Sequence, residues 1–240
     1  MATIILENKA QVDLAQDFLS RVKNEANLPR GRVLLIFHDG PLLNGAALSG
    51  CIPKSLLNYA RNERVLNPFI KRRWDCSIVI SQKACLLKER YPAYFTYLLG
   101  HEFGYAYVCL SDVSLHIHYC LIQEFIREAS GNKITQWHEL PHEVCFDQFG
   151  IYIAEHLFSR EKLNMEITQM LKMPNCKARM RLEAMLSLPV SNDFADLRNS
   201  LINFSRPYKD KLIELWKKDA IETGDDSLAK LIVNYDDLFK

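Results

Sequence analysis

The sequence has almost no net charge, which removes one common clue to function. It contains 30 lysine and arginine residues and 29 aspartate and glutamate residues, so its formal net charge is +1. Without an excess of one sign, no general field draws the chain to nucleic acid or to an anionic membrane surface. We interpret the short basic clusters Lys71-Arg72-Arg73 and Lys177/Arg179/Arg181 as solvated faces. The composition therefore predicts neither nucleic acid nor a membrane as a partner.

Long apolar runs and paired cysteines are missing as well. The apolar N-terminal run is broken by Glu7 and has no basic residue before it, so it is not typical of a secretory signal. No stretch is long and apolar enough to predict a transmembrane helix. The seven cysteines form no C-x-x-C pair, which argues against a zinc ribbon and a disulfide framework. We therefore expect reduced thiols in a cytoplasmic protein.

What is present is an ordinary globular composition, with 48% hydrophobic and 25% charged residues over 240 positions. That length suits one large domain or two small ones. Apolar periodicity and the positions of proline and glycine predict an α+β fold, with a small sheet followed by mostly helix. The predicted strands are 32–38 and 74–81, with a loop at 39–49. The predicted helices are 9–26, 93–109, 114–129 and 141–157, then helices after Pro174 with breaks near Pro189, Pro207 and Gly224.

One segment carries a chemical pattern, LLGHEFGYAY at 98–107. In the motif H-E-x-x-H, two histidines one helical turn apart reach the same zinc, while the glutamate acts on the zinc-bound water. His101 and Glu102 match this motif, and Tyr105 stands where the second histidine belongs. The flanking side chains are uncharged, as a helix that bears a buried metal site requires.

A second segment supplies two carboxylates to the same kind of site. Glu143 and Asp147 are four residues apart in the predicted helix 141–157, so they share one helical face. A glutamate can complete a zinc shell, while an aspartate one turn further accepts the free ring N–H of a histidine ligand and fixes its tautomer. The small residues Gly150 and Ala154 follow on the same helix.

Taken together, residues 74–158 resemble the gluzincin metallopeptidases, including the ImmA/IrrE-type branch. The resemblance implies a zincin-like fold, in which a small mixed sheet packs on the active-site helix. Residues 1–158 would form this domain, and 159–240 would be a helical region packed on it. The strand 74–81 would be the sheet edge along which a peptide substrate lies.

The same resemblance assigns roles to individual residues and implies zinc as the cofactor. His101 would be the first zinc ligand, Glu102 the general base, and Glu143 a further ligand. Asp147 would orient the His101 ring from behind. Tyr105 takes the place of the remaining ligand.

Tyr105 departs from the family pattern in a way that weakens metal binding. A phenol has an ordinary pKa near 10, so Tyr105 must lose its proton to bind zinc, whereas neutral imidazole binds readily at pH 7. Other histidines are available as replacement ligands, although each is more often an ordinary core or surface residue: His116, His118, His142 and His156.

The literal motif H-E-x-x-H occurs elsewhere, at His138-Glu139-Leu140-Pro141-His142. Pro141 cannot sit inside the helix that would place both histidines on one face, because it lacks an N–H and clashes with the preceding turn. We expect Pro141 to begin the helix that bears Glu143, with His138 in the preceding connection.

Two functions remain open from the sequence. The first is a cytoplasmic zinc metallopeptidase that acts on protein or peptide substrates, with activity reduced or lost through Tyr105. The alternative is a catalytically inactive zincin-fold module that binds a protein partner. C-terminal aromatic residues are available to pack on such a site or in the core: Phe204, Tyr208, Trp216, Tyr235 and Phe239. Each motif residue taken alone also has an ordinary interpretation as a core or surface residue, and only their joint occurrence favours the zincin hypothesis.

Overall fold

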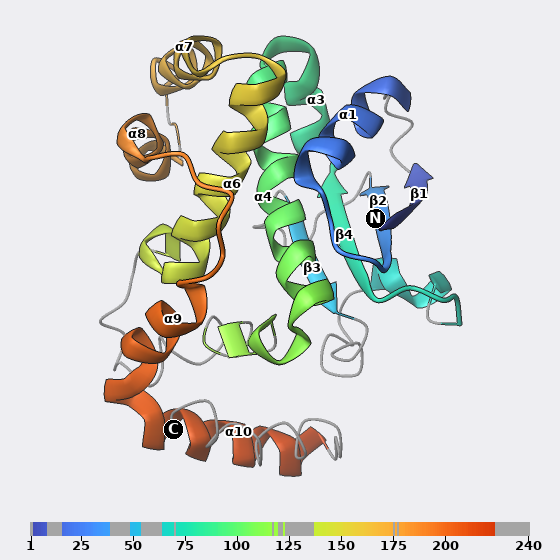
Figure 1. Cartoon of the computed structure of the whole chain (residues 1–240), viewed down its shortest axis with the longest axis vertical. Coiled ribbons are helices and arrows are strands. Elements are labelled where there is room, and N and C mark those ends of the chain that lie inside the picture. Colours follow the sequence, from blue (N-terminus) through green and yellow to red (C-terminus); the bar gives the residue numbers. More distant parts are fainter. Residues whose placement is uncertain are drawn as a thin grey trace.

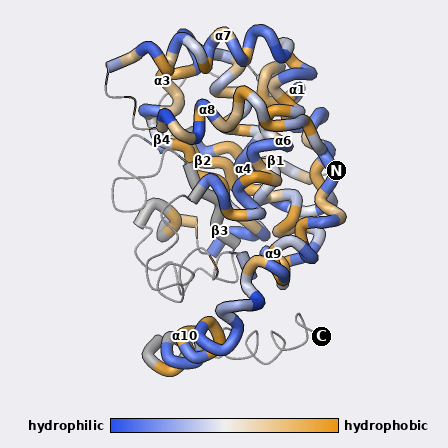
Figure 2. The backbone as a smooth tube through the Cα atoms, turned by 90° about the vertical axis from the view of Figure 1, so that its left-hand side faces the viewer, coloured by the Kyte–Doolittle hydropathy of each residue, from blue (hydrophilic) through white to orange (hydrophobic). Residues whose placement is uncertain are grey.

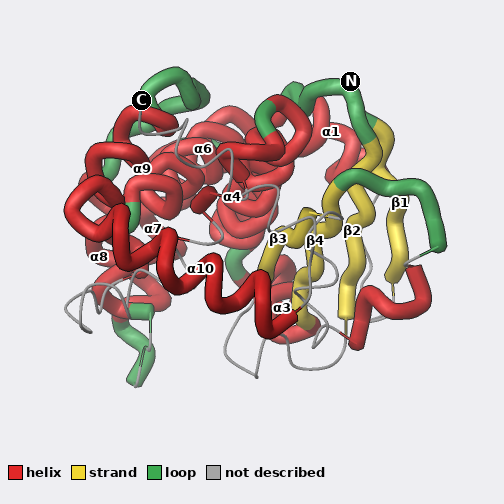
Figure 3. Tube along the Cα trace, turned by 90° about the horizontal axis from the view of Figure 1, so that it is seen from below, coloured by secondary structure: helices red, strands yellow, loops and turns green. Residues whose placement is uncertain are grey.

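The computed structural model describes residues 2–8, 16–38, 49–53, 64–69, 71–116, 118–119, 122, 137–174, 176 and 178–223. Within these ranges the chain forms one sheet at one side and a group of helices at the other (Figure 3). The strands are β1 (Thr3–Asn8), β2 (Arg32–His38), β3 (Ser49–Pro53) and β4 (Cys76–Ser81). The α-helices are α1 (Gln16–Ala26), α3 (Gln82–Arg90), α4 (Pro92–Ser111), α6 (Pro141–Leu157), α7 (Arg160–Leu171), α8 (Arg179–Ser187), α9 (Leu197–Ser205) and α10 (Lys209–Thr223). Short 3-10 helices are η2 (Arg64–Phe69), η3 (Trp137–Glu139) and η4 (Arg206–Tyr208). The expected α+β class is confirmed.

The sheet is mixed, in the order β1-β2-β4-β3. β1, β2 and β4 run parallel, and β3 pairs antiparallel with β4. The expectation that the strand 74–81 forms the sheet edge is wrong, because β4 lies between β2 and β3 and pairs with both. The edge on that side is β3.

Both faces of the central strands are covered, which explains the apolar run 33–37 in β2 and the burial of every residue of β4. One face of β2 and β4 belongs to a core cluster with α4, through side chains such as Leu35, Ile78 and Phe95. The other face packs against η2 and the residues after it, in a smaller cluster of Leu34, Ile36, Leu66, Phe69, Trp74 and Val79.

Helix α4 runs through the middle of the molecule, between the sheet and α6 (Figure 1). Most of its 20 residues are buried. Pro92 occupies its first turn, where a missing N–H costs little. Glu166 of α7 accepts a hydrogen bond from the Tyr94 backbone N–H at 2.9 Å, so a residue from another helix caps this buried start. The helix predicted at 93–109 is confirmed.

α4 and α6 approach each other at backbone distance, because glycine faces glycine where they meet. A Cβ on Gly100 would lie 3.0 Å from the Cα of Gly150. A Cβ on Gly150 would lie 2.6 Å from the backbone oxygen of Tyr97. No side chain larger than hydrogen fits there without a shift. This close approach brings the polar residues of both helices within reach of one another.

The C-terminal helices pack on this pair. α7 contacts α4, α6 and α8, and α9 contacts α6. The outer helix α7 alternates between hydrophilic and hydrophobic residues (Figure 2), as expected for a helix with one covered face. Phe204 and Tyr208 are partly buried against a core cluster that includes Leu201 and Leu212. The division of the chain at residue 158 stays a prediction.

The predicted breaks after Pro174 are found where the structure describes them. Pro189 lies in the connection between α8 and α9, and Pro207 lies in η4. Residues 113–116 and 118–119 are helical, in agreement with the start of the helix predicted at 114–129. Residue 122 is helical as well. The remaining residues of that helix (117, 120–121 and 123–129), residues 9–15, 39–48 and Gly224, and the side chains of Trp216, Tyr235 and Phe239 lie outside the described part.

Two expectations about the class of protein can be compared with the described residues. No described helix has the length and apolar character needed to cross a membrane. Five cysteines have free thiols: Cys76, Cys85, Cys109, Cys145 and Cys176. The free thiols agree with the expectation that these side chains form no disulfide framework.

Candidate functional site

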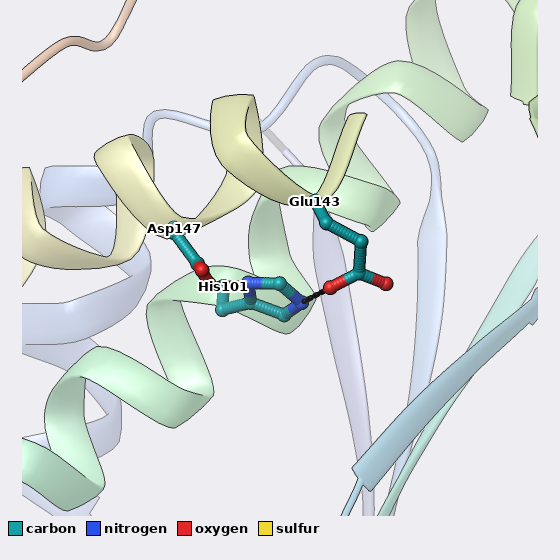
Figure 4. Close-up of side chains that lie close together, drawn as sticks. All are labelled: His101, Glu143 and Asp147. Atoms are coloured by element: carbon teal, nitrogen blue, oxygen red, sulfur yellow. Dashed lines mark ion pairs between the residues drawn. The ribbon is translucent and has the colours of Figure 1, made fainter. Parts of the chain in front are cut away.

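Three of the predicted site residues meet at one point between α4 and α6. His101 comes from α4, and Glu143 and Asp147 come from α6 (Figure 4). A ligand atom of each side chain lies within 4.8 Å of the others, and all three residues are buried. The four-residue spacing of Glu143 and Asp147 therefore does place both carboxylates toward His101.

Asp147 lies behind the imidazole, as expected for a residue that orients it. Its Oδ1 is 2.8 Å from Nδ1 of His101. The same oxygen accepts a hydrogen bond of 2.5 Å from the Tyr97 hydroxyl. Tyr97 lies one helical turn before His101, and the sequence analysis did not identify it. A buried tyrosine needs a partner for its hydroxyl, so an apolar helix that carries tyrosine one turn from a histidine is a signal that points to such a contact.

Glu143 faces the other nitrogen of the ring. Its Oε2 is 3.6 Å from Nε2 of His101. Two ligands of a tetrahedral zinc, each about 2.0–2.1 Å from the metal, are roughly 3.3 Å apart. His101 and Glu143 are thus spaced like two ligands of one cation.

Tyr105 does not point a free oxygen toward that position. Its hydroxyl donates a hydrogen bond of 2.5 Å to Oε1 of Glu143. The ring packs against Phe146, with centroids 4.2 Å apart. The phenol in this arrangement keeps its proton and uses it to hold one carboxylate oxygen of Glu143.

An arginine that the sequence analysis assigned to a solvated face completes the cluster. The Arg181 guanidinium comes from α8, and its Nη2 donates to Oδ1 of Asp147 at 2.5 Å and to Oε2 of Glu143 at 3.2 Å. Nη2 also lies 3.2 Å and 3.5 Å from the two ring nitrogens of His101. The Arg181 side chain is only 30% exposed, so the interpretation of Arg181 as solvated is wrong.

These charges shift one another's protonation. Burial alone would raise the pKa of Glu143 and Asp147, but Arg181 and then His101 outweigh it, and both pKa values are lowered. Burial and Arg181 act to lower the pKa of His101, but Asp147 and Glu143 together raise it. Burial also opposes the charge on Arg181, yet Tyr97, Asp147 and Glu143 raise its pKa well above the ordinary value. The cluster therefore favours two anions beside two cations.

The donor set does not fit a catalytic zinc, which takes three protein ligands and a water. His101 Nε2 and Glu143 Oε2 are suitably placed. Asp147 lies on the Nδ1 side of the ring, and the Tyr105 hydroxyl is a donor to Glu143. A guanidinium already contacts the ligand atoms that a cation would use.

The remaining predicted residues lie around this cluster without joining it. Glu102 is buried on α4 and is not among the described groups able to hold a cation. The four candidate replacement histidines also lie outside that group. His116 contacts the backbone oxygen of Tyr105, and His142 stacks on Tyr119 at 5.1 Å between centroids.

The literal H-E-x-x-H at 138–142 is not a metal motif in the structure. His138 and Glu139 belong to η3, and Pro141 begins α6. The two histidines therefore lie in different elements, which confirms the expectation from Pro141.

Comparison of the chain with protein-family models, with curated proteins and with solved structures found no match. The resemblance to gluzincin peptidases therefore rests on the motif residues of the sequence alone.

Proposed function

We propose that the chain is a zincin-like protein that binds an extended protein segment without hydrolysing it. One observation carries the loss of hydrolysis: the residue in place of the second histidine donates its hydroxyl proton to Glu143 instead of offering a lone pair to a metal. Two ligands are left, and the water that would attack a peptide bond has no metal to lower its pKa.

Support for peptide binding comes from the edge strand. β3 is antiparallel to β4, and within the described part of the chain no strand pairs with its outer edge. An exposed strand edge presents unpaired N–H and C=O groups, to which an extended segment can add as a further strand. β3 also contacts α4, so such a segment would pass close to the helix that bears His101. A reducing, cytoplasmic setting is part of the proposal, supported by the five free thiols.

Hydrogen exchange on complexes with peptides tests the binding site. Peptides selected from a random library on the immobilised protein are expected to slow amide exchange at 49–52 in β3. β1 is the matched control, because it is the other edge of the same sheet. Absence of any selected binder, or protection confined to β1, would overturn the proposal.

A zinc-dependent peptidase is the second candidate, favoured by the 3.6 Å spacing of His101 Nε2 and Glu143 Oε2. It predicts turnover of a fluorogenic peptide mixture that a chelator abolishes and that Glu102→Gln removes. The binding module predicts no turnover above that of Glu102→Gln, with peptide binding equal in the two proteins.

A further inference from the structure

The Arg181 guanidinium links three helices through one set of charges. His101 belongs to α4, Glu143 and Asp147 belong to α6, and Arg181 belongs to α8. Nη2 of Arg181 lies within 3.5 Å of all three other side chains. A single nitrogen therefore lies close to both carboxylates and to the imidazole ring.

The carboxylates need such a cation. Glu143 and Asp147 are both almost fully buried, with side chains 7% and 4% exposed. Two buried carboxylates close together repel each other and lose hydration, so a nearby cation must compensate them. His101 supplies at most one positive charge, and Arg181 supplies the second.

Helix α8 otherwise packs on α7, where Arg179 also donates a hydrogen bond of 2.8 Å to the Leu171 backbone oxygen. It has nine residues, and only Leu182 and Met185 are buried. At its end, the Arg160 guanidinium donates to the backbone oxygens of Met185, Leu186 and Leu188. A helix this short is not stable by itself, so its position depends on such tertiary contacts.

We propose that Arg181 is the resident cation of this site: its guanidinium takes the place of a metal ion between Glu143, Asp147 and His101, and thereby fastens α8 to α4 and α6. The residues of a peptidase-type centre here serve to dock a C-terminal helix. Arg181 fills this role whether or not a peptide binds at β3. A divalent cation can enter the cluster only when the guanidinium leaves.

Thermal unfolding of Arg181→Met in a chelating buffer, and then in excess zinc or cobalt, tests this. We expect the Tm to fall by roughly 4–8 °C in chelator, because two buried carboxylates lose their partner. Zinc or cobalt should restore at least half of that loss in Arg181→Met, and cobalt should give visible absorption bands. The wild-type Tm should not change with either metal.

Arg179→Met is the matched control, because Arg179 lies on the same helix but is 50% exposed and bonds only to the exposed Glu183 and to the Leu171 backbone oxygen. It should lose little stability and show no response to metal. His101→Ala in the Arg181→Met background should abolish the metal response. If Arg181→Met does not fold, Arg181→Lys takes its place in the test. Lysine keeps the positive charge on a shorter side chain, so we expect a smaller fall in Tm and a smaller recovery in zinc or cobalt.

Three results would overturn the proposal. One is a wild-type protein that binds cobalt as well as Arg181→Met does. Another is a Tm loss in Arg181→Met no larger than in Arg179→Met. The third is a Tm loss in Arg181→Met that neither metal restores. Peptide binding at β3 is measured separately, so its failure is distinguishable from each of these results.

Discussion

The polar atoms of Tyr105 and Arg181 act as hydrogen-bond donors and not as metal ligands. A phenol and a guanidinium are hydrogen-bond donors at neutral pH, whereas zinc ligands must offer lone pairs. Both residues direct their donors at Glu143, and Arg181 also donates to Asp147. The buried acceptors of the site are thus satisfied by donors from within the chain.

Removal of the Tyr105 hydroxyl tests whether its hydrogen bond to Glu143 stabilises the protein. Tyr105→Phe leaves one buried oxygen of Glu143 without its donor, so we expect the free energy of unfolding to fall by about 1–3 kcal/mol. Urea unfolding followed by fluorescence measures the change. Tyr107→Phe, on the same helix but only partly buried, should change it by less than about 0.5 kcal/mol. Equal effects of the two substitutions would contradict the hydrogen bond to Glu143.

The sequence was informative about His101, Glu143 and Asp147 and misleading about Arg181. The first three follow a spacing that helix geometry converts directly into a shared face. Arg181 lies 80 positions after His101, and a long basic side chain on a short helix is usually solvated. Its contacts come from tertiary structure, because α8 packs on α7 and the long Arg181 side chain reaches Glu143 and Asp147.

Among the secondary-structure elements, the predicted bounds agree best with the structure where a local sequence signal marks the element. β2 matches 32–38 and α6 matches 141–157, since the first is buried on both faces and the second begins with proline. The predicted loop 39–49 overlaps β3 only at Ser49, and no strand is predicted at 50–53, because SGCIP is short and contains glycine and proline, which usually mark turns. Its strand character comes from pairing with β4, which no local pattern reveals.

The contact of α4 with α6 gives the sharpest prediction at this scale. Gly150→Ala places a methyl group 2.6 Å from the Tyr97 backbone oxygen, so the two helices must separate. We expect a loss of about 1–3 kcal/mol, despite the higher helix propensity of alanine. Gln148→Ala, on the same helix and only partly buried, is the control and should be nearly neutral. A more stable Gly150→Ala protein would show that the helices have room.

The buried N-terminus of α4 gives a second prediction for an element. Glu166→Ala leaves the Tyr94 N–H without its acceptor in a buried position, so we expect a loss of about 1–3 kcal/mol in urea unfolding. Glu183→Ala removes an exposed ion pair with Arg179 and should cost less than about 0.5 kcal/mol. If the two losses are equal, Glu166 does not cap α4.

At the scale of the whole molecule, buried histidines tie stability to pH. Burial lowers the pKa of His116 and His118 to about 3, from an ordinary value of 6.5. Between these values the unfolded chain binds more protons than the folded one. Their contribution is therefore fully present above pH 6.5 and is lost progressively as the pH falls toward 3.

Urea unfolding at several pH values measures this dependence. From pH 6.5 to 4.5 we expect the free energy of unfolding to fall, by up to about 1.4 kcal/mol per pH unit for each of the two histidines. His116→Gln should make the slope shallower. The depressed pKa values of Glu143 and Asp147 add a further loss at lower pH. A free energy that stays constant down to pH 4.5 would contradict neutral buried histidines.

The most direct measurement of the central claim is a crystal structure of the protein grown with excess zinc, with anomalous data collected at the zinc edge. We expect no anomalous peak between His101 and Glu143, and guanidinium density of Arg181 within hydrogen-bond distance of Asp147. A zinc peak bonded to Nε2 of His101 and a carboxylate oxygen of Glu143, with Arg181 turned away, would contradict that claim.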